Sequence, residues 1–294
     1  MSTATDQAGA VRTGLVMAVG SALAYGINIV GVQLSGLSGI SGPLIIFYRT
    51  GLMLVGLALV IALWRVPLVV PREHRRPLVL LGVMSALVGS AYLSSVAFLP
   101  VSVAVVIFYT FPVIVVLAEP FVSGTKFGVA RLLLALVAFT GVAMVIGPNF
   151  SSLDPRGILL ASIASLAAAL QFFAAARCAN VPEVPKLFWV NLMVAPVAVV
   201  ILMVTGGFRP PSALMMAPIA ASVAIGGFVF GLVLQFAALS RIAAGPAALA
   251  FCLEPVAASG FAALILGERM LPLQYLGVAL VLGAVAANVV REQR

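Results

Sequence analysis

The chain of 294 residues is 63% hydrophobic and only 8% charged, and it carries a formal net charge of +8. Soluble domains average roughly 25% charged residues, so we expect the bulk of this chain to lie in a lipid bilayer. Its basic residues stand in short links between apolar runs, a pattern that encodes membrane topology and argues against a nucleic-acid partner.

Ten apolar runs are long enough to cross a bilayer, since a span needs about 20 apolar residues. Strand-like alternation is absent from the sequence, which favours an all-α membrane protein over a barrel. The predicted spans are residues 13–33, 42–64, 77–98, 101–119, 127–147, 157–177, 187–206, 214–239, 243–266 and 270–290. Residues 1–12 form a polar leader before a first run of full spanning length, so we expect the leader to stay attached.

The second half of the chain repeats the first at an offset of 143 residues, with shifts of one or two residues in the middle. Matching positions are Gly14 with Gly157, Leu23-Ala24 with Leu166-Ala167, Asn28 with Gln171, Pro112 with Pro255, and Gly124 with Gly267. We predict two five-helix repeats, residues 13–147 and 157–290, with a linker at 148–156 and a tail at 291–294. Five spans are an odd number, so the second repeat is inverted, as in secondary transporters with a site near the midplane.

The first link contains Gly36-Leu37-Ser38-Gly39, which matches the GxSG string of intramembrane serine proteases. That chemistry needs a histidine base close to the serine, and the only histidine, His74, stands in a link on the opposite face. Cys178 and Cys252 show neither CxxC nor Cys/His spacing. We therefore expect no catalytic residue, no metal and no cofactor.

Arg49 stands in the outer third of the second span, next to Tyr48. A charged residue at this depth is costly, and long side chains often reach back to the interface. We expect Arg49 to reach the outer interface or to pair within the protein. Contact with a substrate carboxylate is the alternative.

Pro112 and Pro255 stand inside the fourth and ninth spans at equivalent repeat positions. Proline removes a backbone donor and kinks a helix, so the pair predicts symmetric hinges for alternating access. The alternative is a static kink, which is common in membrane helices.

Glu254, directly before Pro255, is an ionisable residue near the middle of the ninth span. Such a residue usually faces a cavity or a partner. We consider three roles: a proton-coupling carboxyl, a contact for a substrate amino group, or a hydrogen bond to backbone freed by the proline. Its counterpart in the first repeat is Phe111, so the site is predicted to have a polar and an apolar wall.

Aromatic and amide side chains at moderate depth extend this candidate substrate site. Amides in lipid need hydrogen-bond partners and should face the bundle interior. Taken alone, each residue is better explained by interhelical bonding or an interfacial aromatic belt, and only the set points to a site. The set is Tyr25, Asn28, Tyr92, Tyr109, Gln171, Trp189, Asn191 and Gln235. Gly227 and Gly231 in the eighth span form a GxxxG pair, which we interpret as close helix packing.

Orientation follows from the basic residues. With a cytoplasmic N-terminus, twelve of the sixteen Lys and Arg residues fall on or near the cytoplasmic side and three fall outside, while Arg49 lies within a helix. This bias predicts cytoplasmic termini. Usage of fourteen Arg against two Lys suggests a GC-rich genome, and hence a bacterial inner membrane. Ten helices enclose a cavity without a partner, which is compatible with a monomer.

The segment Leu253-Glu254-Pro255, the turn Leu266-Gly267-Glu268-Arg269 and the following glycines, Gly277 and Gly283, resemble the EamA-type branch of the drug/metabolite transporter superfamily. The equivalent turn in the first repeat, Gly124-Thr125-Lys126, lacks the acid. The resemblance covers essentially the whole chain. It implies a secondary transporter that holds its solute between the repeats and commonly exports amino acids or other metabolites.

We therefore predict an exporter of amino acids, aromatic or neutral, or of similar small metabolites, working by alternating access. Export of another metabolite or drug class is the first alternative. An intramembrane enzyme and a passive channel are the others, and the misplaced His74 argues against the enzyme.

Overall fold

The computed structural model describes residues 4–124, 126–148, 153–205 and 207–293, and no strand is found in these ranges. Its first-half helices are α1 (Ala4–Leu37), α2 (Gly42–Trp64), α3 (Arg72–Ser95), α4 (Val101–Phe108), α5 (Phe111–Ser123) and α6 (Val129–Ile146). Its second-half helices are α7 (Pro155–Arg177), α8 (Glu183–Val204), α9 (Pro218–Leu239), α10 (Ala244–Phe251), α11 (Leu253–Leu266) and α12 (Pro272–Glu292), with a short 3₁₀ helix at Pro211–Met216.

The described residues contain ten candidate membrane spans, as the sequence predicts. α4 with α5 forms the fourth span, and α10 with α11 forms the ninth. The first helix is longer than predicted at both ends, because helical structure begins at Ala4 and continues to Leu37. Large apolar side chains such as Leu63, Val204 and Leu264 are more than 70% exposed, which suits a surface that faces lipid.

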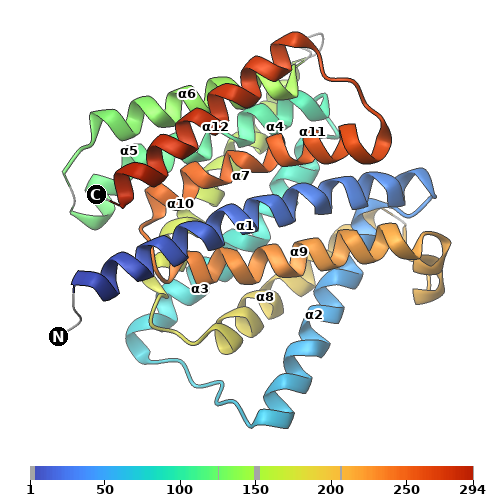
Figure 1. The fold of residues 1–294 in the computed structure, drawn as a ribbon. Helices are drawn as coiled ribbons and strands as arrows, with labels where there is room; N and C mark the ends of the chain where they lie inside the picture. Colours follow the sequence, from blue (N-terminus) through green and yellow to red (C-terminus); the bar gives the residue numbers. More distant parts are fainter. Residues whose placement is uncertain (1–3, 125, 149–152, 206, 294) are drawn as a thin grey trace.

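The helices form one bundle in which the start of α1 and the end of α12 lie at the same end (Figure 1). We call this end of the bundle the terminal end and the opposite one the distal end. Neighbouring helices come mostly from different halves of the chain. α1 packs along α9, α3 along α7, α2 against α8, and α6 against α12.

The two largest interfaces between the halves of the chain are counterparts in which the roles of the halves are swapped. α1 and α7 occupy equivalent repeat positions, as do α3 and α9, so the α1–α9 and α7–α3 interfaces correspond to each other. A Cβ atom added at Gly14 would lie 2.7 Å from Ile242, which follows the end of α9. One added at Gly157 would lie 2.5 Å from Leu99, which follows the end of α3. Gly157 and Ile242 stand 143 positions after Gly14 and Leu99, so the same close contact is made twice.

The GxxxG pair of α9 lies in the α1–α9 interface, as predicted. A Cβ atom at Gly227 would lie 2.9 Å from the Ala24 carbonyl oxygen, and one at Gly231 would lie 3.0 Å from the ring of Tyr25. Glycine therefore lets the two backbones approach closely here. The turn residues Gly124 and Gly267 are also repeat mates. They end α5 and α11 with left-handed φ values of 66° and 70°, a conformation that favours glycine.

Candidate functional site

The fourth and ninth spans are both broken in the middle of the bundle. α4 ends at Phe108 and α5 begins at Phe111, while α10 ends at Phe251 and α11 begins at Leu253. Pro112 and Pro255 follow directly after the breaks and are buried. Because neither proline offers an N–H, the backbone ladder of each span is interrupted at the same repeat position. Bending at these points during transport stays a prediction.

Aromatic rings fill the space around the two breaks. Successive ring centroids lie 5.2–6.0 Å apart, a separation typical of favourable aromatic pairs. The series connects α3, α4, α5, α7, α10, α1 and α9, so it crosses from one half of the chain to the other. We call it the aromatic cluster, and its members in order are Tyr92, Phe108, Phe111, Phe172, Phe251, Tyr25 and Phe228, with Tyr109 packed on Phe108 and Phe111.

Glu254 lies beside this cluster, at the first turn of α11. The Tyr109 hydroxyl lies close enough to interact with its carboxyl group. Tyr25 and Tyr92 lie within electrostatic range of the same carboxyl. No ion pair to Glu254 is formed within the described part of the chain. Three tyrosines from three spans therefore lie near one acid that forms no ion pair with any described basic side chain.

The other predicted site residues divide into three groups. Gln235 accepts a hydrogen bond of 2.8 Å from the Tyr25 hydroxyl and so belongs beside the cluster. Asn28 bonds the Ala224 carbonyl, and its repeat mate Gln171 donates to Ser85 at 2.8 Å, which are bonds across the two equivalent interfaces. Trp189 and Asn191 lie apart from the cluster and donate to the carbonyl oxygens of Leu68 and Leu187, at 3.1 and 2.9 Å. Their roles in binding stay predictions.

The phenylalanines of the cluster are absent from the predicted set. A phenylalanine in an apolar span gives no contrast with its neighbours, so depth and polarity alone do not reveal it. One signal was available in the repeat. Phe108 and Phe251 stand 143 positions apart, and each precedes its proline by four residues.

Of the two expectations for Arg49, the structure supports pairing within the protein, although the partner is an aromatic ring and not an acid. The arginine side chain turns into the bundle instead of reaching the outer interface, and its Cζ atom lies 3.4 Å from the ring centroid of Phe228. The ring face attracts the cation and holds the guanidinium inside. Its Nε atom is buried without a hydrogen-bond partner, and Arg49 forms no ion pair with any described residue. The internal partner of Arg49 is therefore the Phe228 ring, and no acid pairs with it in the described ranges.

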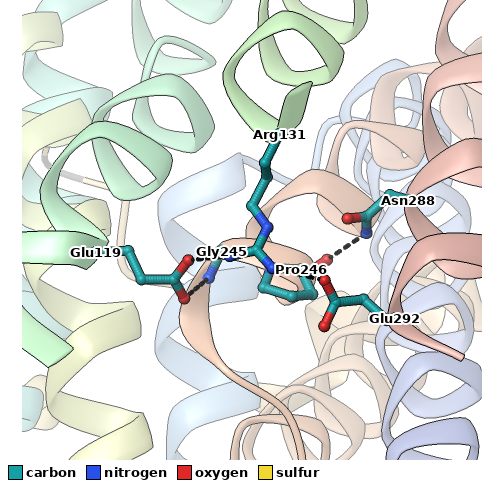
Figure 2. A network of polar contacts seen from close by, with 6 residues as sticks. All are labelled: Glu119, Arg131, Gly245, Pro246, Asn288 and Glu292. Atoms are coloured by element: carbon teal, nitrogen blue, oxygen red, sulfur yellow. Dashed lines mark hydrogen bonds and ion pairs between the residues drawn. The ribbon is translucent and has the colours of Figure 1, made fainter. Parts of the chain in front are cut away.

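A second polar network closes the terminal end of the bundle (Figure 2). Glu119 of α5 accepts from Arg131 of α6 at 2.6 Å and from the backbone N–H of Gly245, in α10, at 2.9 Å. Arg131 also pairs with Glu292 of α12 at 2.7 Å. Asn288 of α12 donates to the Pro246 carbonyl at 3.2 Å. We call Glu119, Arg131 and Glu292 with the N–H of Gly245 the terminal latch, since it ties both repeats together.

The two ends of the bundle are packed differently. All eight residues of α10 at the terminal end are buried, whereas only Val103 and Ala104 are buried in its repeat mate α4 at the distal end. α5 packs against α10, but the equivalent pair α4 and α11 forms no comparable interface among the described residues. The structure is therefore closed at the terminal end and looser at the distal end.

The model of the EamA-like transporter family matches residues 12–147 and again residues 155–290, which is nearly the whole chain. No curated protein matches the chain in sequence. A crystal structure described simply as "Crystal structure of protein" superposes with a TM-score of 0.75 at 17% identity, covering 96% of this chain and 99% of the other. At that identity the likeness shows a shared fold.

Proposed function

Because the chain belongs to the EamA-like transporter family, we propose that this membrane transporter exports amino acids with aromatic or neutral side chains, or similar small metabolites, by alternating access. One observation carries the choice of solute class. The aromatic cluster and Glu254 meet between the two halves of the chain, at the breaks of the fourth and ninth spans. An amino group would find a carboxyl there, and an apolar or aromatic side chain would find ring faces.

The mechanism rests on the paired breaks. In alternating access, inverted repeats exchange conformations around a fixed site. Here α5 and α10 close the terminal end while α4 and α11 stay apart at the distal end. We propose that bending at Pro112 and Pro255 reverses this arrangement, so that the terminal end opens and the distal end closes.

The proposal includes cytoplasmic chain termini and a location in the bacterial inner membrane. Both chain ends belong to the terminal end, and the basic residues concentrate in its links, which supports cytoplasmic termini. On this reading the structure is outward-facing, with its cytoplasmic side held by the terminal latch. We propose the bacterial inner membrane as its location.

Proteoliposomes test this function. Vesicles carrying the purified protein are loaded with a labelled mixture of amino acids, and release is followed with and without a pH gradient. We expect release of aromatic and neutral amino acids that the gradient accelerates. Glu254→Gln is expected to remove the dependence on the gradient, because the amide does not carry a proton. Glu268→Gln at the distal surface is the matched control and is expected to behave as the wild type.

Each alternative predicts a different result in the same assay. A transporter for another metabolite or drug class would leave amino acids inside and release other labelled solutes from a wider panel. A passive channel would release solute without response to the gradient in either protein. Absence of flux for every solute, from a folded sample, would contradict the transport proposal.

A further inference from the structure

Arg49 is a half-buried cation that the described part of the protein leaves without a counterion. It lies on α2, about two turns from the start of the helix, and its guanidinium stacks on Phe228 of α9. Stacking satisfies one face of the group, but its five N–H donors point outward in the plane. Its Nε atom is buried and makes no hydrogen bond.

Glu254 lies beside the same aromatic cluster but forms no ion pair with Arg49. Six other acids have different partners or lie elsewhere. Glu119 and Glu292 pair with Arg131, Glu183 pairs with Lys186, Glu268 accepts from Gln33, and Asp154 caps α7. Glu73 stands in the first turn of α3, at the terminal end. Burying an unpaired charge costs free energy that a stable protein must recover somewhere. A mobile anion that arrives from outside the protein is a natural source of that compensation.

The surroundings of Arg49 show which kind of anion fits. Phe228, on which the guanidinium lies, packs on Tyr25 with a centroid distance of 5.6 Å. Tyr25 in turn lies within electrostatic range of both Arg49 and Glu254. The aromatic cluster thus continues from the acid of α11 to the base of α2, with Tyr25 between them. A solute that spans this path has an anionic end, an aromatic or apolar body and a cationic end.

We propose that Arg49 is the anchor for the carboxylate of the transported solute, with Phe228 and Tyr25 forming the wall beside it. The inference rests on the proposed function and adds to it the residue that selects the acid group. A guanidinium presents two parallel N–H donors, which match the two oxygens of a carboxylate. A site built in this way rejects an analogue whose carboxylate is replaced by a neutral amide, because the cation then remains unpaired.

Binding is measured with two pairs of probes, each an acid and its amide: phenylalanine with phenylalaninamide, and phenylacetate with phenylacetamide. The readout is the midpoint of thermal unfolding in detergent as the probe concentration rises, since a ligand that binds the folded state raises it. We expect both acids to raise the midpoint of the wild type and the amides to have less effect. Arg49→Gln should weaken the apparent affinity for the acids by about tenfold or more.

Two variants make the result specific. Arg49→Lys keeps the charge but loses the paired donors, and we expect it to recover part of the affinity. Arg156→Gln removes an exposed arginine at the start of α7 and should leave binding unchanged. A wild type that the acids do not stabilise, or an Arg49→Gln protein that binds them as tightly, would overturn the proposal. A lipid phosphate held by Arg49 would give the first of these outcomes.

Transport of the same four probes separates this inference from the proposed function. Arg49-dependent binding of the acids without any flux would contradict transport and leave the anchor intact. Flux of amides and acids at equal rates, unchanged in Arg49→Gln, would leave transport intact and contradict the anchor.

Discussion

Glu119→Gln is expected to weaken the terminal latch and to populate a state that is open at the terminal end. The Glu119 side chain is 3% exposed, and its carboxylate accepts one ionic hydrogen bond of 2.6 Å from Arg131 and one of 2.9 Å from the Gly245 N–H. Glutamine preserves the shape and keeps an acceptor for the N–H, but it loses the ion pair. A hydrogen bond to a charged group contributes roughly 1.5–3 kcal/mol, so we take a loss of about 2 kcal/mol.

A loss of about 2 kcal/mol changes the ratio of the two states by about thirtyfold, since each 1.4 kcal/mol is a factor of ten. An open state present at about 1% in the wild type would rise to about a fifth of the molecules. Spin labels at Ser123 and Ala243 measure this change, because these residues stand at the ends of α5 and α10 that meet in the latch. Both buried cysteines, Cys178 and Cys252, are replaced by alanine in this background.

We expect a single short distance between the labels in the wild type and a second, longer one in Glu119→Gln. Glu292→Gln is the matched control. It removes the other acid that pairs with Arg131. The Glu292 side chain is 22% exposed, and a partly exposed ion pair contributes under about 1 kcal/mol. An unchanged distance distribution in Glu119→Gln, or an equal change in Glu292→Gln, would refute the assignment of the latch.

Two further predictions concern packing and bending. Gly227→Ala places a methyl group against the Ala24 carbonyl and should cost about 1–3 kcal/mol, seen as a lower midpoint of thermal unfolding. The adjacent Gly226→Ala meets no atom within 4 Å and should leave that midpoint unchanged or slightly higher, so equal effects would contradict the close contact. Pro112→Ala and Pro255→Ala restore a backbone donor at each break and should slow transport without weakening solute binding; unchanged rates would rule out the hinges.

The spans and the duplication were predictable because each rests on many residues at once. A run of about twenty apolar side chains is recognisable from composition alone. Gly124 and Gly267, which stand 143 positions apart, form the same left-handed turn in the two repeats. The residues at which individual helices begin and end were less predictable. Helical structure reaches Ala4 through polar residues, because a helix continues past the hydrocarbon when its backbone is hydrogen-bonded internally.

Contacts between distant segments were the part that the sequence did not reveal. The depth of Arg49 was clear, but the direction of its side chain depends on Phe228, which stands 179 positions later. The latch joins Glu119 to Gly245 and Arg131 to Glu292, pairs that are 126 and 161 residues apart. No local pattern marks such pairs, since each acid or base alone looks like an ordinary charge near the end of a span and Gly245 contributes only its backbone N–H.

The duplicated scaffold is symmetric, but its charged groups are not. Glu254, Arg49, Glu119 and Arg131 correspond to Phe111, Leu192, Ala262 and Gln274, none of which carries a charge. At the distal end Gln274 donates to the Val145 carbonyl at 2.8 Å, a neutral bond in the place of the ionic latch. Because hydrogen bonds to charged groups are stronger than neutral ones, closure of the terminal end is the more stable of the two. In the proposed alternating access, the repeat supplies two related conformations, and we propose that divergence of the charged positions favours the one closed at the terminal end.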